Sequence, residues 1–143
     1  KNVIENKDGY RLIYVKGKPI KREIDVQIMF RLTWFASPAD VSREANEGRG
    51  PVDFKVSRGA FDKTLIEFKL ASNTKLAQNL EKQVEIYKKA HDTEKAIKAI
   101  LFFSVDEEAK VNKIISDLGL VGEKYIVLID ARRDNKVSAS KAR

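Results

Sequence analysis

The sequence contains no cysteine and only one histidine among its 143 residues. The absence of thiols excludes disulfides, a cysteine nucleophile and any cysteine-based zinc site. The single imidazole, His91, excludes a histidine-rich metal centre and argues against a Ser-His-Asp triad. No apolar run approaches the roughly 20 residues that cross a bilayer, and no signal peptide is recognised. We therefore expect no membrane partner and a cytoplasmic location.

Carboxylates, lysines, hydroxyls and a hard metal ion remain for chemistry. Hydrophobic residues make up 43% of the chain, which is enough for the core of one domain spanning residues 1–143. The net charge of +7 favours a polyanionic partner. Because the chain begins at Lys1 rather than Met, we also consider it a fragment of a longer protein. A homodimer or contacts with further domains of that protein would be compatible with this composition.

The first half of the chain shows two helical patterns after a polar, basic segment. We expect residues 1–22 to form a peripheral arm or hairpin that turns at residues 16–19. Apolar residues three and four positions apart predict a helix that begins near Ile24, with the following positions on its buried face: Ile24, Ile28, Leu32 and Phe35. Ser37-Pro38-Ala39-Asp40 resembles a helix start, so a second helix is expected from Ser37 to Gly48.

Strands and helices then follow one another to the end of the chain. Alternating apolar residues predict paired strands at Pro51–Ser57 and Thr64–Ala71. The next elements expected are a helix from Asn73 or Thr74 to His91, a buried strand at Ala96–Phe103, a helix from Ser104 to Leu118 and a strand at Tyr125–Ile129. A loose basic tail is expected over residues 132–143. This order predicts an α/β fold with a central mixed β-sheet flanked by helices.

The two front strands carry an unusual set of charged residues. Alternation along the strands places Asp53 on the face away from Phe54, and it places Glu67 and Lys69 together on one face. If these strands pair, two carboxylates and one ammonium group converge at one edge of the sheet. Two close carboxylates repel each other unless a cation lies between them. Their oxygens suit Mg²⁺ or Mn²⁺, and the neighbouring lysine suits a role beside an attacking water.

The helix after these strands carries a polar pair one turn apart, Gln83 and Tyr87. Gln83 lies beside the apolar stripe of that helix, where a polar group needs a partner. We expect its amide to face the carboxylate strands, and the ring of Tyr87 to pack in the core.

Together these residues resemble a known family of enzymes. Gly50-Pro51-Val52-Asp53, then Glu67-Phe68-Lys69, then Gln83 to Tyr87 resembles the PD-(D/E)XK nuclease superfamily, and more narrowly its QxxxY branch of RecB-type nucleases and lambda exonuclease. The Pro-x-Asp form departs from a strict Pro-Asp pair. The resemblance implies a restriction-endonuclease-like core of helix, three strands, helix and strand. The third strand of this core is not separately visible; Phe61–Thr64 or Tyr125–Ile129 are the candidates.

The resemblance also implies a role for each site residue. Asp53, Glu67 and the Phe68 backbone carbonyl would hold Mg²⁺ or Mn²⁺. Lys69 would orient the attacking water, Gln83 would complete the shell, and Tyr87 would support the motif. An acidic residue on the helix before the first strand often completes such a site, for which we prefer Glu44 over Glu47.

We therefore expect a Mg²⁺-dependent deoxyribonuclease domain that hydrolyses phosphodiester bonds of DNA, with RNA as a further substrate to test. The alternative is a nucleic-acid-binding or scaffolding module that has this fold and does not cleave. Glu67 and Lys69 alone could also form an exposed ion pair without function, worth ~0–1 kcal/mol.

Overall fold

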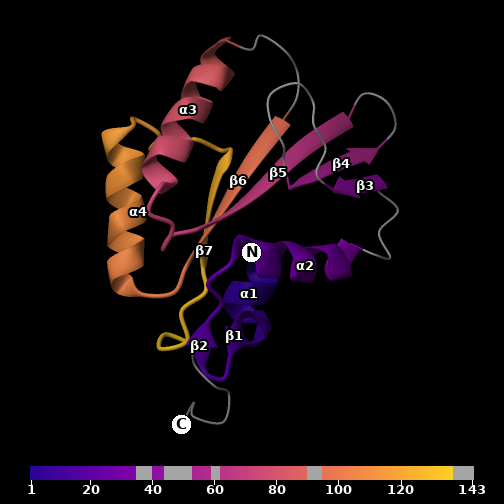
Figure 1. The fold of residues 1–143 in the computed structure, drawn as a ribbon, viewed down its shortest axis with the longest axis vertical. Helices are drawn as coiled ribbons and strands as arrows, with labels where there is room; N and C mark the ends of the chain where they lie inside the picture. Colours follow the sequence, from indigo (N-terminus) through magenta and orange to yellow (C-terminus); the bar gives the residue numbers. More distant parts are fainter. Residues whose placement is uncertain (35–39, 44–52, 59–61, 90–94, 137–143) are drawn as a thin grey trace.

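A five-stranded mixed sheet with helices packed on it forms the centre of the molecule (Figure 1). The structure, a computed structural model, describes residues 1–34, 40–43, 53–58, 62–89 and 95–136. The helices and strands, in chain order, are α1 (Asn2–Asn6), a 3₁₀ helix (Gly9–Ile13), β1 (Tyr14–Val15), β2 (Lys18–Pro19), α2 (Glu23–Trp34), β3 (Asp40–Arg43), β4 (Phe54–Arg58), β5 (Asp62–Leu70), α3 (Leu76–Lys89), β6 (Lys95–Phe102), α4 (Val105–Asp117) and β7 (Ile126–Asp130). The predicted mixed α/β architecture is confirmed.

The sheet runs in the order β3-β4-β5-β6-β7. Its first three strands form an antiparallel meander, whereas β5, β6 and β7 are parallel to one another. Parallel neighbours need a crossover, and helices α3 and α4 supply the two crossovers. The sheet thus changes from antiparallel to parallel at β5.

The predicted second helix, Ser37–Gly48, is wrong where the structure describes it, because Asp40–Arg43 form strand β3. This strand pairs with β4, with Val41 opposite Val56. A helix-start pattern is a weak local preference, and backbone pairing with a neighbouring strand outweighs it. Neither candidate for the third strand of the meander was right. Residues 62–64 of the first candidate are the start of β5, and residues 126–129 of the second belong to β7. The third strand of the meander is β3.

Two hydrophobic cores lie on opposite faces of the sheet, and β6 contributes alternately to both. Ala99 and Leu101 face the core beneath α2, which also contains Phe54, Phe68 and Leu70. The other core lies beneath α3 and α4 and consists of Ala71, Leu76, Leu80, Ile100, Phe102, Val111, Ile115 and Leu120. The α2 side also brings together the rings of Phe30, Phe54 and Phe68. This alternation fixes which side chains of β5 and β6 share a face.

Helix α2 confirms the predicted helix but not its predicted buried face. Val26 is buried, and Met29 and Phe30 pack against the same core. Ile28 and Leu32 are instead 53% and 73% exposed. The predicted buried face is therefore wrong at these two positions, because apolar residues occur on more than one side of this helix; Phe35 lies outside the described residues.

The N-terminal segment and the start of the C-terminal tail are joined to the sheet. The predicted hairpin turn is present between β1 and β2, with Gly17 at a φ of 76°. Ile13 and Ile20, which flank the hairpin, are buried in the core, and the Tyr14 hydroxyl donates to the Ala131 carbonyl at 3.0 Å. The segment is therefore part of the packed structure. The predicted loose tail is corrected for its first residues below; residues 137–143 lie outside the described part of the chain.

Candidate active site

Two carboxylates cap the part of β5 that extends past its neighbour β4. The described pairing of β4 with β5 ends at Phe54 opposite Ile66, although β5 continues to Leu70. The Phe68 N–H donates to the Asp53 carboxylate at 2.6 Å, and the Leu70 N–H donates to Glu23 at 3.3 Å. A buried backbone N–H needs a partner, so these two carboxylates meet a requirement of the fold. They also bring two negative charges to one edge of the sheet.

Glu67 and Lys69 lie at this edge, as the alternation along the strand predicts. The Lys69 Nζ atom is 2.7 Å from Glu67 Oε1 and 3.4 Å from Glu23 Oε2. The Glu67 and Lys69 side chains are only 12% and 13% exposed. The pair is therefore not the exposed ion pair that was the alternative without function. Lys69 instead bridges two carboxylates in a largely buried setting.

A second lysine, Lys98, reaches the same carboxylate from the next strand. Lys98 of β6 lies opposite Glu67 in the parallel register, and its ammonium group forms an ion pair with Glu67 Oε2. Its side chain is 5% exposed. We call the five residues around this edge the carboxylate–lysine cluster: Glu23, Asp53, Glu67, Lys69 and Lys98.

Burial shifts the pKa values of two groups in the cluster. Burial raises the pKa of Asp53, against the Phe68 N–H, the Lys69 charge and a hydrogen bond from Gln27. Burial also lowers the pKa of Lys98 to about 7, against the charge of Asp53. The contact between Lys98 and Glu67 favours the ammonium form as well, because an opposite charge stabilises a buried cation. Perturbed acids and bases gathered at one place are typical of functional sites.

Four predicted site residues cannot be compared with these positions. Glu44 and Glu47 lie outside the described residues. Gln83 and Tyr87 lie on α3, as predicted, but the structure does not describe their side chains. Their roles therefore stay predictions.

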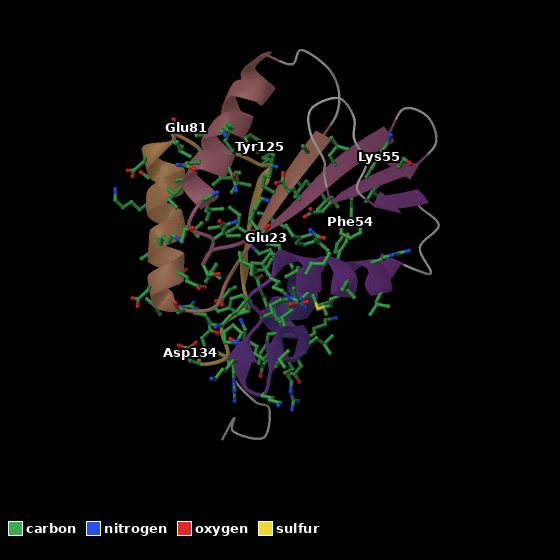
Figure 2. All side chains as sticks on the ribbon, in the orientation of Figure 1. Glu23, Phe54, Lys55, Glu81, Tyr125 and Asp134 are labelled. Carbon is green, nitrogen blue, oxygen red and sulfur yellow. The ribbon has the colours of Figure 1, made fainter. Side chains whose placement is uncertain are left out.

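Glu23 is an acidic residue at this edge that the sequence patterns did not indicate. It lies at the start of α2, the helix that precedes the first strand of the sheet, and Figure 2 shows it beside the sheet. Its carboxylate also accepts from the Asn73 side chain at 3.0 Å. The contact with Lys69 joins residues 46 positions apart in sequence, for which no local pattern gives a signal.

Lys98 was also missed, although the sequence carries a signal for it. It interrupts an apolar stretch, Ala96–Phe103, that we interpreted as a fully buried strand. A lysine in such a strand needs a buried anionic partner. That requirement could have linked it to an acidic residue on a neighbouring strand.

The donor set of the cluster fits one hard divalent cation. Asp53 and Glu67 supply carboxylate oxygens, and Mg²⁺ typically takes one or two protein carboxylates and keeps several waters. The Phe68 N–H points toward Asp53. In a strand the carbonyl of a residue points to the same side as its N–H, so the Phe68 carbonyl also faces this edge. The raised pKa of Asp53 indicates a carboxylate that would gain from a nearby cation. Among the described residues no group of three or more acidic, histidine or cysteine side chains forms a ready metal cage.

An open cavity of about 360 Å³ lies next to the cluster. It is lined by Lys21, Glu23, Leu70, Ser72, Asn73 and Thr74. Glu23 and Leu70 belong to both the cavity wall and the contacts described above, so the cavity opens at the Glu23 end of the cluster.

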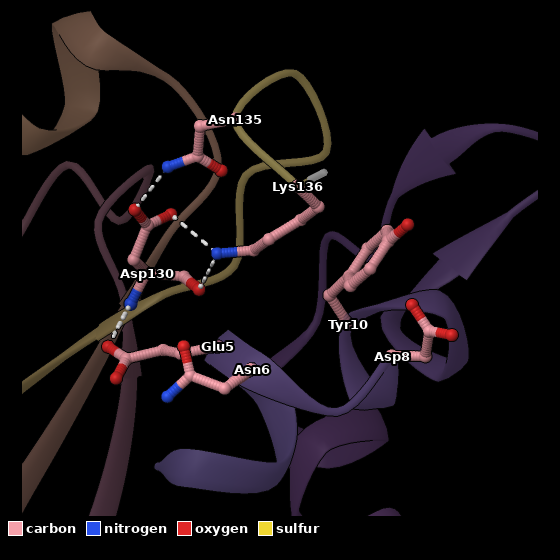
Figure 3. A pocket seen from close by; sticks show the side chains of 7 residues that line it. All are labelled: Glu5, Asn6, Asp8, Tyr10, Asp130, Asn135 and Lys136. Atoms are coloured by element: carbon pink, nitrogen blue, oxygen red, sulfur yellow. Dashed lines mark hydrogen bonds and ion pairs between the residues drawn. The ribbon is translucent and has the colours of Figure 1, made fainter. Parts of the chain in front are cut away.

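A second cavity, of about 510 Å³, lies between α1 and the segment after β7 (Figure 3). Its central carboxylate, Asp130, accepts from Asn135 at 2.6 Å and from Arg132 at 2.8 Å. The Asp130 N–H donates to Glu5 at 3.0 Å, and Lys136 donates to the Asp130 carbonyl at 3.2 Å. These bonds hold residues 132–136 in place, which corrects the prediction of a tail that is loose from Arg132. Because Asp130 is engaged by its own neighbours, we assign this cavity a structural role.

Comparison with known proteins gives a family but no activity. Residues 1–105 match a family model described as a domain of unknown function, DUF8371. The match includes every member of the carboxylate–lysine cluster. No curated protein matches the chain at a significant level. In the described part of the chain, none of the helices has the length and apolar character needed to cross a membrane.

Proposed function

The chain belongs to the DUF8371 family, whose function is unknown, and we propose that it is a divalent-metal-dependent nuclease that hydrolyses phosphodiester bonds of DNA. The observation that carries the proposal is the convergence of Asp53, Glu67 and Lys69 at the edge of β5 that extends past its described pairing with β4. These are the three residues that the PD-(D/E)XK motif would use.

The order of elements supports the same proposal. Helix α2, the meander β3-β4-β5, helix α3 and the parallel strand β6 follow one another as helix, three strands, helix and strand. This is the order expected of a restriction-endonuclease-like core. The positions of the motif agree as well, with Asp53 immediately before the second strand and Glu67-Phe68-Lys69 on the third.

Each residue of the site has a role in the proposed reaction. Asp53, Glu67 and the Phe68 carbonyl would hold Mg²⁺ or Mn²⁺, which would polarise a phosphate oxygen and make bound water more acidic. Lys69 would orient the attacking water and stabilise the charge that develops on the phosphate. Glu23 keeps the Lys69 ammonium group at this edge, and Gln83 would contact the water or the phosphate from α3.

The reaction is a hydrolysis that needs water and no other co-reactant. The water oxygen forms a bond to phosphorus, one phosphorus–oxygen ester bond breaks, and the leaving oxygen takes a proton. The net charge of +7 would aid approach of the polyanionic strand. The cavity beside Glu23 opens at the Glu23 end of the carboxylate–lysine cluster.

Cleavage of labelled linear and circular DNA tests the proposal, with RNA as a parallel substrate and with Mg²⁺, Mn²⁺ and EDTA compared. Wild-type protein should cleave DNA with either ion and not with EDTA. Lys69→Ala should lose at least about a hundredfold in rate, because it removes a contact that stabilises the transition state. DNA affinity should change only a few-fold, since one lysine among many contributes little to phosphate binding.

Lys113→Ala is the matched control, because Lys113 also lies in an ion pair but on the exposed surface of α4. It should cleave at the wild-type rate. Equal loss in both variants, or cleavage that persists in EDTA, would reject the assigned site.

One observation favours a second candidate, a nucleic-acid-binding module that does not cleave. Both carboxylate oxygens of Glu67 already contact an ammonium group, so the cluster can neutralise itself without a metal. This candidate predicts salt-dependent DNA binding with no nicking by the wild-type protein in any divalent ion.

A further inference from the structure

Lys98 is a charged residue in the interior of an apolar strand. Its neighbours along β6 include Ile97 and Ala99, and its side chain is 5% exposed. Burial of an ammonium group is strongly unfavourable unless an anion pairs with it. The anion is Glu67, directly opposite on β5. An apolar residue would be buried here at a lower cost in free energy. We therefore look for the role of this lysine in the carboxylate–lysine cluster rather than in the packing of the strand.

The two lysines on Glu67 differ in what holds them. Lys69 contacts Glu67 Oε1 at 2.7 Å and also lies 3.4 Å from Glu23, so it can leave Glu67 and keep a carboxylate partner. Lys98 contacts the other oxygen, Oε2, from β6, an interior strand of the sheet. Its next negative neighbour is Asp53. A cation that takes Oε1 therefore displaces Lys69 toward Glu23 and leaves Lys98 in place.

Two-metal sites need room for two cations about 3.5–4 Å apart that share carboxylate ligands. The carboxylate–lysine cluster has three carboxylates and two ammonium groups. When all five groups are ionised, the cluster has one net negative charge. One divalent ion changes this to one net positive charge, so a second ion would have to bind at a site that is already positive. The second oxygen of Glu67 is also already in contact with Lys98.

We propose that Lys98 acts as a built-in cation at Glu67, so that the site binds one divalent ion rather than two. Lys98 is thus a positioning residue that fixes the Glu67 carboxylate. This inference rests on the proposed metal-dependent function and specifies its metal content.

Titration of Mn²⁺ into the purified full chain tests the inference without any activity assay. Electron paramagnetic resonance measures free Mn²⁺, and calorimetry gives the number bound. Wild-type protein should bind one ion. Lys98→Met removes the charge at similar length and should bind two, with the magnetic coupling of adjacent Mn²⁺ ions in the spectrum. Lys98→Arg keeps the charge and should bind one.

Lys113→Met serves as the matched control and should bind one ion, because it removes an ion-paired lysine from the exposed surface of α4. Thermal unfolding checks that each variant is folded; if Lys98→Met is not, Lys98→Gln takes its place with the same expectation of two ions. Two coupled ions in wild-type protein, or one ion in a folded variant without the Lys98 charge, would overturn the inference while leaving a metal-dependent nuclease intact. No ion in wild-type protein would overturn the proposed function and the inference together.

Discussion

Asp53 caps the backbone of β5 and is also a partly buried carboxylate, and these two roles have opposite effects on stability. The bond from the Phe68 N–H at 2.6 Å favours the ionised form, but burial raises the pKa of Asp53 overall. A carboxyl group whose folded pKa is raised binds its proton more tightly in the folded state. Its charge therefore destabilises the metal-free fold as pH rises through that pKa. The stability of the metal-free fold therefore gives no reason for an ionised carboxylate at this position.

Asp53→Asn should separate the two roles. The amide oxygen of the variant can still accept from the Phe68 N–H, and the partly buried charge is gone. The free energy of unfolding without metal should therefore fall by less than about 1 kcal/mol or rise. Mn²⁺ should raise the Tm of wild-type protein and leave that of the variant unchanged. Asp117→Asn, at an exposed aspartate of α4, should respond to Mn²⁺ like wild type. Equal Mn²⁺ stabilisation of Asp53→Asn would show that Asp53 is not a ligand.

The positions of single side chains could be predicted from sequence where the two-residue period of a strand decides which face of the sheet a side chain occupies. Alternation along β5 placed Glu67 beside Lys69, and the structure confirms this placement. Glu23 could not be found this way, because its approach to Lys69 depends on how α2 packs over the sheet through Val26 and Phe30. Long-range contacts of this kind follow from packing, which no short pattern encodes.

At the scale of whole elements, helix starts were predicted well where side chains cap the backbone. Ser104 accepts from the Glu107 N–H at 3.2 Å, as the capping pattern before α4 predicts. The Glu107 side chain reaches one residue further back than the pattern predicts and accepts from the Phe103 N–H at 2.7 Å. The similar pattern at Ser37 did not produce a helix over Asp40–Arg43, because those residues complete the meander with β4. A local signal decides only where no neighbouring strand competes for the backbone.

Helix α3 carries the part of the predicted site that the fold alone does not test. Leu76 and Leu80 are buried against the sheet, and Gln83 lies three residues after Leu80, a spacing that returns to the same face of a helix. Gln83→Ala should therefore reduce cleavage roughly ten- to a thousand-fold and cost only ~1 kcal/mol of stability. Gln78→Ala, at an exposed position of α3, is the control. A matching loss of Tm and no effect on rate would assign Gln83 to the fold rather than to the site.

At the scale of the whole molecule, Asp130 joins segments from both ends of the chain (Figure 3). Its N–H binds Glu5 of α1, and its carboxylate binds Arg132 and Asn135. Arg132 also pairs with Glu108 of α4 at 3.1 Å. These contacts explain why the start of the basic tail is held against the N-terminal segment, although the composition of the tail predicts a loose segment.

The same contacts predict how stability depends on pH. Burial by itself raises the pKa of Asp130, but the hydrogen bonds from Arg132 and Asn135 and the charge of Lys136 outweigh it and lower the pKa to about 2. An unfolded aspartate has a pKa of about 3.9. The folded state therefore gains stability from the ionised group above about pH 4, and it loses this gain as pH falls toward 2.

Asp130→Asn should lower the free energy of unfolding by roughly 1–2 kcal/mol at pH 7, allowing for the partial exposure of the group to solvent. Urea unfolding at pH 7, 4 and 2 measures this, and the difference from wild type should shrink between pH 4 and 2, where the wild-type carboxylate becomes protonated. Asp134→Asn, at an exposed aspartate of the same segment (Figure 2), should stay within about 0.5 kcal/mol of wild type throughout. A difference between Asp130→Asn and wild type that stays constant down to pH 2 would mean that Asp130 stabilises the molecule through shape and neutral hydrogen bonds, and not through its charge.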